Sequence, residues 1–247
     1  MIKLILEEDT FENFLTSIYF AFYSKKEITY IGLEDFKDLD MLTEKLIIRT
    51  DLSKFNKVSD AIVSKIDPLA LNKIYTLYLS NYNNKGLLCF NYLKKAFKLG
   101  SNIHKHLYLK EVKELNLIER KVNLESHSFT GFLRFSLIEN KFLYSIIEPD
   151  NNILELISPH FERRFKNEYW IIHDKKRNIA SIYNKVSWEI YNIDSNYFKN
   201  LENYSDKFED LWINYFKSTT IEERINLKLQ KSKMPKRYWK NILEVKN

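Results

Sequence analysis

An acid, a base and a cation occur together in one short stretch of this 247-residue chain, VNLESHSFTGFLRF at residues 122–135. Glu125, His127 and Arg134 lie where a helical pattern of apolar residues gives way to the alternation of a strand. Polar groups at the end of an element are often functional, and these could transfer protons and hold a phosphate. Positions two apart on a helix point to different sides, so Glu125 and His127 converge only if the helix ends by Ser126.

A second group follows Ser158-Pro159, a pair that can start a short helix as N-cap and first helical residue. On such a helix His160 and Arg164 lie one turn apart on one face, with Arg163 beside them. The arginines could hold a phosphate while the imidazole transfers a proton, as in the cleavage of phosphodiester or glycosidic bonds. The alternative for each histidine is a capping or half-buried structural side chain. The candidate catalytic residues are Glu125, His127 and His160.

The other charged candidates have structural explanations as well. Arg134 and Glu148 are expected on neighbouring strands of one hairpin, where a cross-strand salt bridge would satisfy both. Asp174 precedes Lys-Lys-Arg-Asn and is typical of a turn in which a carboxylate accepts backbone N–H groups. Arg177, within this basic turn, is a candidate for contact with phosphate.

The positive charge of the chain is concentrated at its C-terminal end. The formal net charge is +6, yet residues 224–247 hold eight Lys or Arg against one Glu, and the preceding part is close to neutral. A basic segment that includes Tyr238 and Trp239 is typical of a surface that binds phosphates and stacks on unpaired bases. The alternative is a solvated helix whose Trp239 and Ile242 dock on the core. The candidate nucleic-acid-binding residues are Arg134, Arg163, Arg164, Arg177, Lys233, Lys236, Arg237 and Trp239.

The composition excludes several kinds of chemistry. Four glycines permit neither a GxxxxGK phosphate loop nor GxGxxG, and the single Cys89 excludes a thiolate zinc site, an iron–sulfur cluster and an internal disulfide. His160-Phe161-Glu162 has the H-x-E form of zinc deaminases, but the P-C-x-x-C partner is missing. We therefore expect no cofactor and no tightly held transition metal. With no signal peptide and no apolar run near the roughly 18 residues of a membrane span, we expect a cytoplasmic protein.

The periodicity of apolar residues predicts an α+β fold. It has a helical N-terminal half with a small sheet, antiparallel hairpins in the C-terminal half, and a helical C-terminus. We expect one domain over residues 1–247, with a possible division at 100–107. Helices are predicted over residues 10–24, 51–66, 68–82, 85–99, 109–126, 197–217 and 221–229. Strands are predicted over residues 2–6, 28–33, 45–50, 132–138, 141–147, 169–173, 179–183 and 185–192.

Several blocks of the chain together resemble a known family. The first has the frame E-x-H-x-x-x-G-F-x-R-F, from Glu125 to Phe135, and the others are residues 9–22, 147–165, 169–177 and 211–244. In this order they resemble the bacterial family of "probable DNA metabolism proteins", which are encoded beside a DNA-repair radical SAM protein. One departure is Ser128, where the family is expected to carry an arginine that could bind phosphate.

The resemblance implies a role in DNA repair or DNA metabolism rather than a particular reaction. The partner would be a radical SAM protein, because a chain with one cysteine is not itself a radical SAM enzyme. Some members of the family are fused to a uracil-DNA-glycosylase-like domain, which is not expected in this chain. That fusion implies that the present domain is an accessory to base-damage chemistry performed elsewhere.

Three functions of different classes follow. The first and favoured one is a DNA-binding accessory that acts with a radical SAM or glycosylase partner. The second is an enzyme that acts on a damaged base or phosphodiester through His127 and His160. The third is a structural adaptor whose basic tail contacts acidic protein. Turnover of damaged DNA by the isolated protein separates the first two, and DNA binding at moderate salt separates both from the third.

Overall fold

The computed structural model describes residues 1–33, 43–193, 214–215, 218–221 and 225–242. The chain forms two compact units, Met1–Val122 and Asn123–Asn247. Each mixes helices and strands, which confirms the predicted α+β class. The segment 100–107, where a division seemed possible, lies inside the first unit and begins as the 3-10 helix η1 (Gly100–Lys105). Among the described residues no helix is long and apolar enough to cross a membrane.

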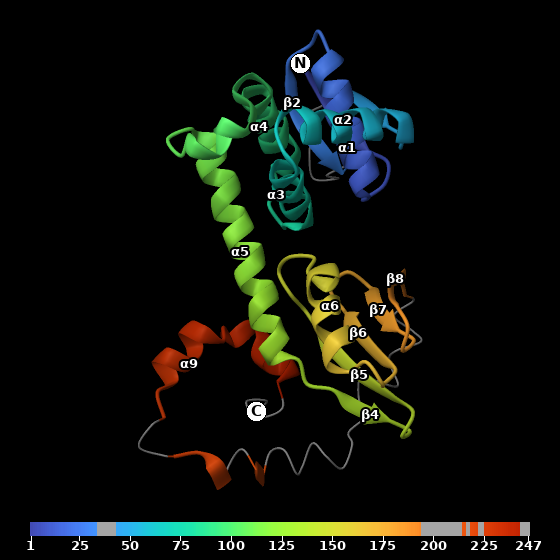
Figure 1. The fold of residues 1–247 in the computed structure, drawn as a ribbon, viewed down its shortest axis with the longest axis vertical. Coiled ribbons are helices and arrows are strands. Elements are labelled where there is room, and N and C mark those ends of the chain that lie inside the picture. Colours follow the sequence, from blue (N-terminus) through green and yellow to red (C-terminus); the bar gives the residue numbers. More distant parts are fainter. Residues whose placement is uncertain (34–42, 194–213, 216–217, 222–224, 243–247) are drawn as a thin grey trace. The chain divides into compact units, whose positions relative to one another are not determined.

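The first unit contains a three-stranded parallel sheet covered by helices (Figure 1). Strand β1 (Ile2–Leu6) lies between β2 (Ile28–Leu33) and β3 (Glu44–Ile48). All five residues of β1 are buried, as expected for the apolar sequence IKLIL at the centre of a parallel sheet. Helix α1 (Phe11–Tyr23) begins at the N-cap Thr10, whose hydroxyl accepts the Asn13 N–H at 3.2 Å.

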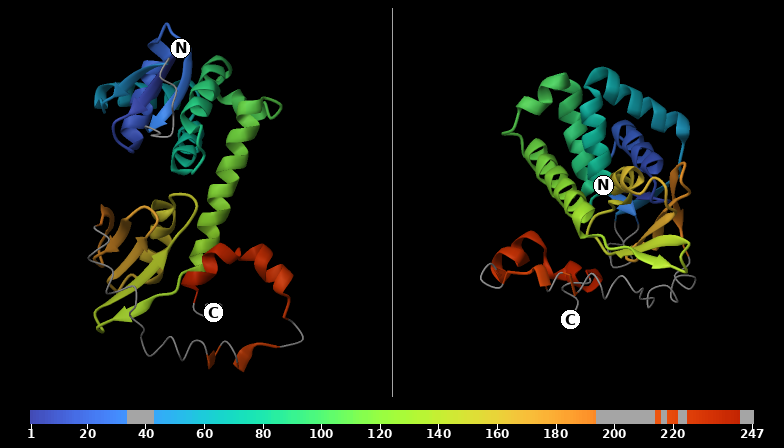
Figure 2. Two further views of the ribbon diagram at one scale, coloured as in Figure 1. Left: turned by 180° about the vertical axis from the view of Figure 1, so that it is seen from behind. Right: turned by 60° about the horizontal axis from the view of Figure 1, so that its bottom comes forward.

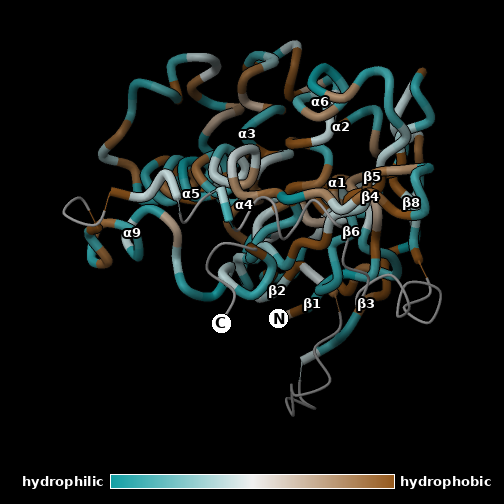
Figure 3. The backbone as a smooth tube through the Cα atoms, turned by 90° about the horizontal axis from the view of Figure 1, so that it is seen from below, coloured by the Kyte–Doolittle hydropathy of each residue, from teal (hydrophilic) through white to brown (hydrophobic). Residues whose placement is uncertain are grey.

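The remaining helices of the first unit lie close to the predicted ranges. They are α2 (Leu52–Lys65), α3 (Pro68–Leu79) and α4 (Lys85–Leu99), the last ending at Gly100 with φ of 58°, a conformation that favours glycine. A Cβ atom at Gly86 would lie 2.3 Å from the Ile31 carbonyl oxygen, so a side chain has no room where α4 meets β2. Hydrophobic and hydrophilic residues alternate along these helices (Figure 3), as amphipathic packing requires.

The second unit is built on a five-stranded sheet in the order β4-β5-β6-β7-β8. These strands are β4 (Ser136–Ile138), β5 (Phe142–Ile147), β6 (Trp170–Asp174), β7 (Ile179–Tyr183) and β8 (Trp188–Asn192). The predicted hairpins β4–β5 and β6–β7 are present, and Glu139 and Asn140 have the positive φ of a tight hairpin turn. Strands β5 and β6 are parallel, and helix α6 (Leu154–Arg164) connects them and packs on β7 and β8 (Figure 1).

Two of the predicted helix boundaries that the structure corrects concern the candidate site. Helix α5 (Lys110–Phe132) continues six residues beyond Ser126, because Phe129 falls at helical spacing from Glu125 and is buried like it. Helix α6 begins at Leu154, with Pro159 inside it. Ser158 is therefore not an N-cap, and its hydroxyl lies 2.7 Å from both the Leu154 carbonyl and the Ser181 hydroxyl.

In the C-terminal part of the second unit, two short helical elements are described over their whole length. The predicted helix 197–217 lies outside the described residues except for 214–215, which are helical. Where 221–229 was predicted, the described helix is α9 (Leu227–Lys233), which begins later because the Asn226 side chain caps the Leu229 N–H at 2.9 Å. The 3-10 helix η3 (Lys236–Asn241) follows and lies beside the last turns of α5 (Figure 2).

Candidate functional site

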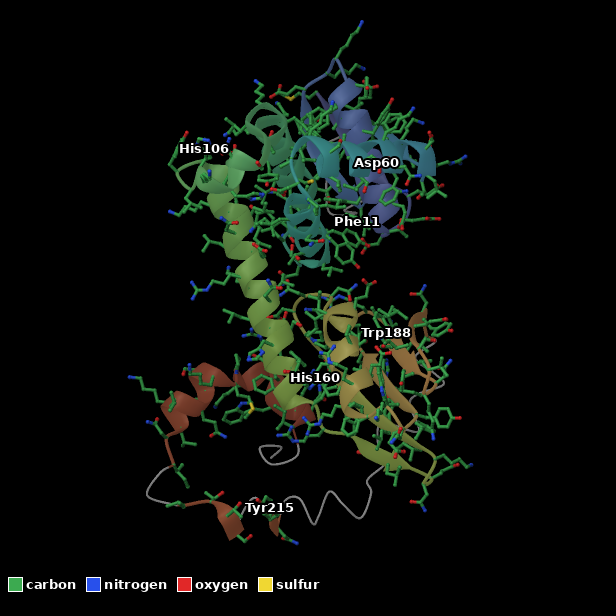
Figure 4. The ribbon with its side chains drawn as sticks, in the orientation of Figure 1. Phe11, Asp60, His106, His160, Trp188 and Tyr215 are labelled. Carbon is green, nitrogen blue, oxygen red and sulfur yellow. The ribbon has the colours of Figure 1, made fainter. Side chains whose placement is uncertain are left out.

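Four cationic or protonatable side chains of the second unit form what we call the cationic cluster: His127, His160, Arg163 and Arg164. His127 is exposed on α5, and the other three belong to the last turn and a half of α6 (Figure 4). Partial burial and the positive charges of Arg164, Arg163 and His127 lower the pKa of His160. The two histidines, 33 positions apart in the sequence, are therefore close enough to interact electrostatically. The lowered pKa favours the uncharged form of the His160 imidazole.

Within the described residues, no acid forms an ion pair with the arginines of the cationic cluster. Arg163 and Arg164 are exposed, and neither forms an ion pair with a described residue. The His160 Nε2 atom is inaccessible to solvent and has no hydrogen-bond partner among the described residues. Two guanidinium groups beside an imidazole could bind an anion and exchange a proton with it.

Aromatic rings surround the α6 side of the cationic cluster. The His160 ring lies edge-on to Phe161, with centroids 5.0 Å apart. The Arg164 guanidinium lies over the Phe165 ring, 5.5 Å from its centroid. Phe135, from the chain segment after α5, contacts both phenylalanines with centroids 5.3 and 5.2 Å away. These contacts hold the end of α6 at a defined place, because stacked rings restrict the rotamers of the side chains above them.

Glu125 lies on a different side of α5 from His127, as expected for a helix that continues past Ser126. It is buried, and both carboxylate oxygens accept hydrogen bonds. Its Oε1 accepts the Asp150 N–H at 2.7 Å and the Tyr238 hydroxyl at 2.5 Å. Its Oε2 accepts the Asn151 N–H at 2.9 Å and the Asn151 side-chain amide at 2.5 Å. The carboxylate thus fastens α5 to the loop before α6, with no oxygen free for a substrate.

The basic C-terminal segment is only partly free. Tyr238 is buried and cannot stack on a base, which corrects the expectation from sequence. Arg237 forms an ion pair with Asp150 at 2.9 Å, and Lys240 forms one with Glu148. Ile242 is buried as the structural alternative predicted, while Trp239 is half-buried and donates its indole N–H to the Met234 carbonyl at 2.8 Å.

Several lysines of this segment remain available. Lys228, Lys231 and Lys233 are exposed and form no ion pair with a described residue. Lys236 is exposed as well, and its ammonium group lies 5.8 Å from the Trp239 ring. The cationic surface of the segment therefore belongs to α9 and the start of η3 rather than to Arg237.

Arg177, together with Asp174, stabilises the loop before α6 to which Glu125 is hydrogen-bonded. The Asp174 carboxylate accepts the Lys176 and Arg177 N–H groups at 3.0 and 3.3 Å, which confirms the predicted turn. The Arg177 guanidinium donates to Asp174 at 2.7 Å and to the carbonyls of Pro149 and Asp150 at 3.2 and 2.6 Å. Burial raises the pKa of the Asp174 carboxyl against the opposing effect of Arg177.

Arg134 lies between α5 and β4 rather than within the predicted strand. Its guanidinium donates to the carbonyls of Gly131 and Leu133 at 2.8 and 3.0 Å, at the end of the helix. A cation in this position complements the negative end of the helix dipole. Glu148, its predicted cross-strand neighbour, pairs with Lys240.

Sequence reasoning missed the partners that make Glu125 structural. Asp150 and Asn151 belong to one of the blocks that resemble the family. No local sequence pattern, however, shows that two backbone N–H groups will donate to the carboxylate of a residue far away in the sequence. A buried glutamate on the apolar face of a helix was the available signal, because such a group must be hydrogen-bonded. Among the described residues no three His, Cys, Asp or Glu side chains are grouped as metal ligands.

Comparison with curated proteins gives no match, and comparison with solved structures gives none either. The model of one family, a domain of unknown function called DUF4130, matches residues 83–244. The matched range includes the whole cationic cluster, together with Glu125 and Tyr238. Because the match covers more than half of the chain, the protein belongs to the DUF4130 family.

Proposed function

We propose that this protein binds DNA through its phosphates at the cationic cluster, and that it is an accessory in DNA repair or DNA metabolism. The observation that carries the proposal is the exposure of Arg163 and Arg164 beside two imidazoles, without an ion pair to any described residue. Exposed guanidinium groups without acidic partners are typical of surfaces that bind phosphate. The exposed lysines 228, 231 and 233 would add contacts that do not depend on sequence.

The context of repair comes from the resemblance of the sequence blocks and not from the cluster. It suggests a radical SAM partner, or a glycosylase, that performs the chemistry while this chain holds the nucleic acid. Arg134, Arg177 and Arg237 are bound to carbonyl or carboxylate groups of their own unit. We therefore assign them to the support of the site rather than to contact with DNA.

The test is DNA binding by the full-length protein over a range of salt concentrations, measured by fluorescence anisotropy of a labelled duplex and a labelled single strand. The slope of log K against log salt changes by about 0.9 for each phosphate contact on a duplex. Replacement of Arg163 and Arg164 by Gln should therefore reduce the slope by about 1.8.

A matched control removes two positive charges from the first unit, by Lys57→Gln with Lys113→Gln. Both lysines are exposed and form no ion pair with a described residue. This control should leave the slope unchanged. Equal slopes for the wild type and the Arg163/Arg164 variant would refute the cationic cluster as the phosphate site. Loss of all binding at moderate salt would favour a protein adaptor instead.

A DNA-modifying enzyme is the second candidate, favoured by one observation. The lowered pKa of His160 favours an imidazole that can accept a proton, and this imidazole lies beside two arginines that could hold a phosphate. Incubation of the isolated protein with DNA that contains damaged bases should then give turnover that His160→Gln abolishes. Absence of turnover, with DNA binding intact, supports the accessory role.

A further inference from the structure

The C-terminal residues 234–242, called the strap below, fill the space between two elements of the second unit. The Tyr238 ring lies 4.9 Å from Phe129 and 6.3 Å from Phe132, both on the last turns of α5. On its other side the strap contacts β5, and Lys240 pairs with Glu148 directly after that strand. The strap therefore joins the helix that carries His127 to the sheet on which α6 packs (Figure 2).

One hydrogen-bond chain links the strap to the loop before α6. The Tyr238 hydroxyl accepts from Arg237 at 3.0 Å and donates to Glu125 at 2.5 Å. Burial and the Glu125 carboxylate raise the pKa of Tyr238, so the hydroxyl keeps the proton that it donates. Glu125 in turn accepts the N–H groups of Asp150 and Asn151, which lie four and three residues before the start of α6.

We propose that the strap is a positioning element, and that its Tyr238 hydroxyl, acting through Glu125, sets the distance between His127 and the three α6 residues of the cationic cluster. The inference rests on the proposed function only where DNA affinity is the readout. It gives a role to the Glu125-x-His127 pair of the sequence: the glutamate points inward and holds the geometry, and the histidine points outward and faces the ligand. Tyr238 and Glu125 act through other residues and touch no phosphate.

The experiment compares the full-length wild type with Tyr238→Phe, which removes the hydroxyl and keeps the ring. The pKa of His160, followed by NMR, reports the distance of His127 and the burial of the imidazole. Hydrogen exchange of amides in the strap reports its local opening. The Tyr238→Phe variant should show a higher His160 pKa, about tenfold faster exchange in the strap, and weaker binding of a short DNA duplex, because a buried bond to a charged group is lost.

Tyr82→Phe is the matched control. Tyr82 donates to the Glu114 carboxylate in the first unit, so the substitution removes the same chemical pair from a place unconnected with the cationic cluster. It should change none of the three measurements. If Tyr238→Phe fails to fold, Arg237→Gln replaces it. That change breaks the Asp150 ion pair and leaves the Tyr238 hydroxyl, so smaller shifts in the same directions are expected.

Two results would overturn the inference. One is strap exchange at the wild-type rate in Tyr238→Phe, which would mean that the hydroxyl does not hold the strap. The other is faster strap exchange with an unchanged His160 pKa, which would mean that the strap is held but positions nothing. A raised His160 pKa in a protein whose wild type binds no DNA supports the inference and refutes the proposed function, so the two failures are distinguishable.

Discussion

Replacement of Glu125 by Gln tests whether this residue is structural or chemical. The side chain keeps its size, but one oxygen that accepts two hydrogen bonds becomes an NH₂ group. In either orientation of the amide, its NH₂ group faces a backbone N–H, that of Asp150 or that of Asn151. Two donors then face each other and neither has an acceptor. If Glu125 is catalytic, the variant should lose activity and keep its stability. If Glu125 instead holds α5 to the loop before α6, the variant should lose stability.

The magnitude follows from the four hydrogen bonds. Each bond to a charged group contributes about 1.5–3 kcal/mol, and a buried donor left without a partner adds a further cost. Two acceptances are lost, and the Tyr238 hydroxyl can recover part of one by accepting from the new amide. We expect the free energy of unfolding of the second unit to fall by about 2–4 kcal/mol, a large fraction of the 5–15 kcal/mol typical of a domain.

Tryptophan fluorescence makes the assay specific. All four tryptophans, at 170, 188, 212 and 239, belong to the second unit, so urea unfolding followed by fluorescence reports that unit alone. Circular dichroism reports both units. Glu114→Gln, which loses one bond from Tyr82 in the first unit, should leave the fluorescence transition where it is. If the free energy of unfolding from the fluorescence transition of Glu125→Gln lies within about 0.5 kcal/mol of the wild-type value, Glu125 does not have this structural role, because surface changes have effects of that size.

Three further outcomes are expected. In the folded protein the pKa of His160 is lowered below its ordinary 6.5, so as the pH drops the unfolded chain is protonated at this residue first. The free energy of unfolding should therefore fall as the pH drops below about 6.5. In His160→Gln, the difference between the free energies of unfolding in urea at pH 7.5 and pH 5.5 should be smaller than in the wild type. Burial opposes ionisation of Asp67, but the Ala70 N–H and His104 outweigh it and lower its pKa below 3.8. Its contribution to stability is therefore present above pH 3.8 and lost in stronger acid. Asp67→Ala, which removes the N-cap of α3, should cost about 1 kcal/mol at pH 7 and flatten thermal stability below pH 4. Elemental analysis of untagged protein should find no stoichiometric transition metal, and zinc or iron at one per chain would contradict this and reopen a hydrolytic mechanism.

Local signals were sufficient for much of the fold. The strands β1 and β2 and the helix α4 were predicted with their observed bounds, because an apolar β-branched run and a glycine cap are short-range patterns. The errors at α5 and α6 have the opposite cause. The apolar helical pattern was predicted to end at Ser126, and Pro159 was predicted to start a helix, yet burial of Phe129 and Ile157 keeps both helices intact through these positions.

The candidate site could be predicted only in part. His160 and Arg164 were predicted on one face of a helix from their spacing of four residues, and both lie on α6. The hydrogen bond between Glu125 and Tyr238 joins residues 113 positions apart, and no periodicity of the sequence connects the two. The parallel pairing of β5 with β6 was also missed, because hairpins are short-range and a crossover through α6 is not.

The tight meeting of α4 with β2 has a practical consequence for work on the family. The family match starts at residue 83, two residues before α4, and suggests a fragment that begins there. Such a fragment would lack β2, against which Gly86 is packed, and would expose Leu88, Leu93 and Ala96, which are buried in the whole chain. An uncovered apolar helix face of this kind promotes aggregation. Because expression from residue 1 keeps that face covered, we expect the whole chain to stay in solution at concentrations at which the fragment from residue 83 aggregates.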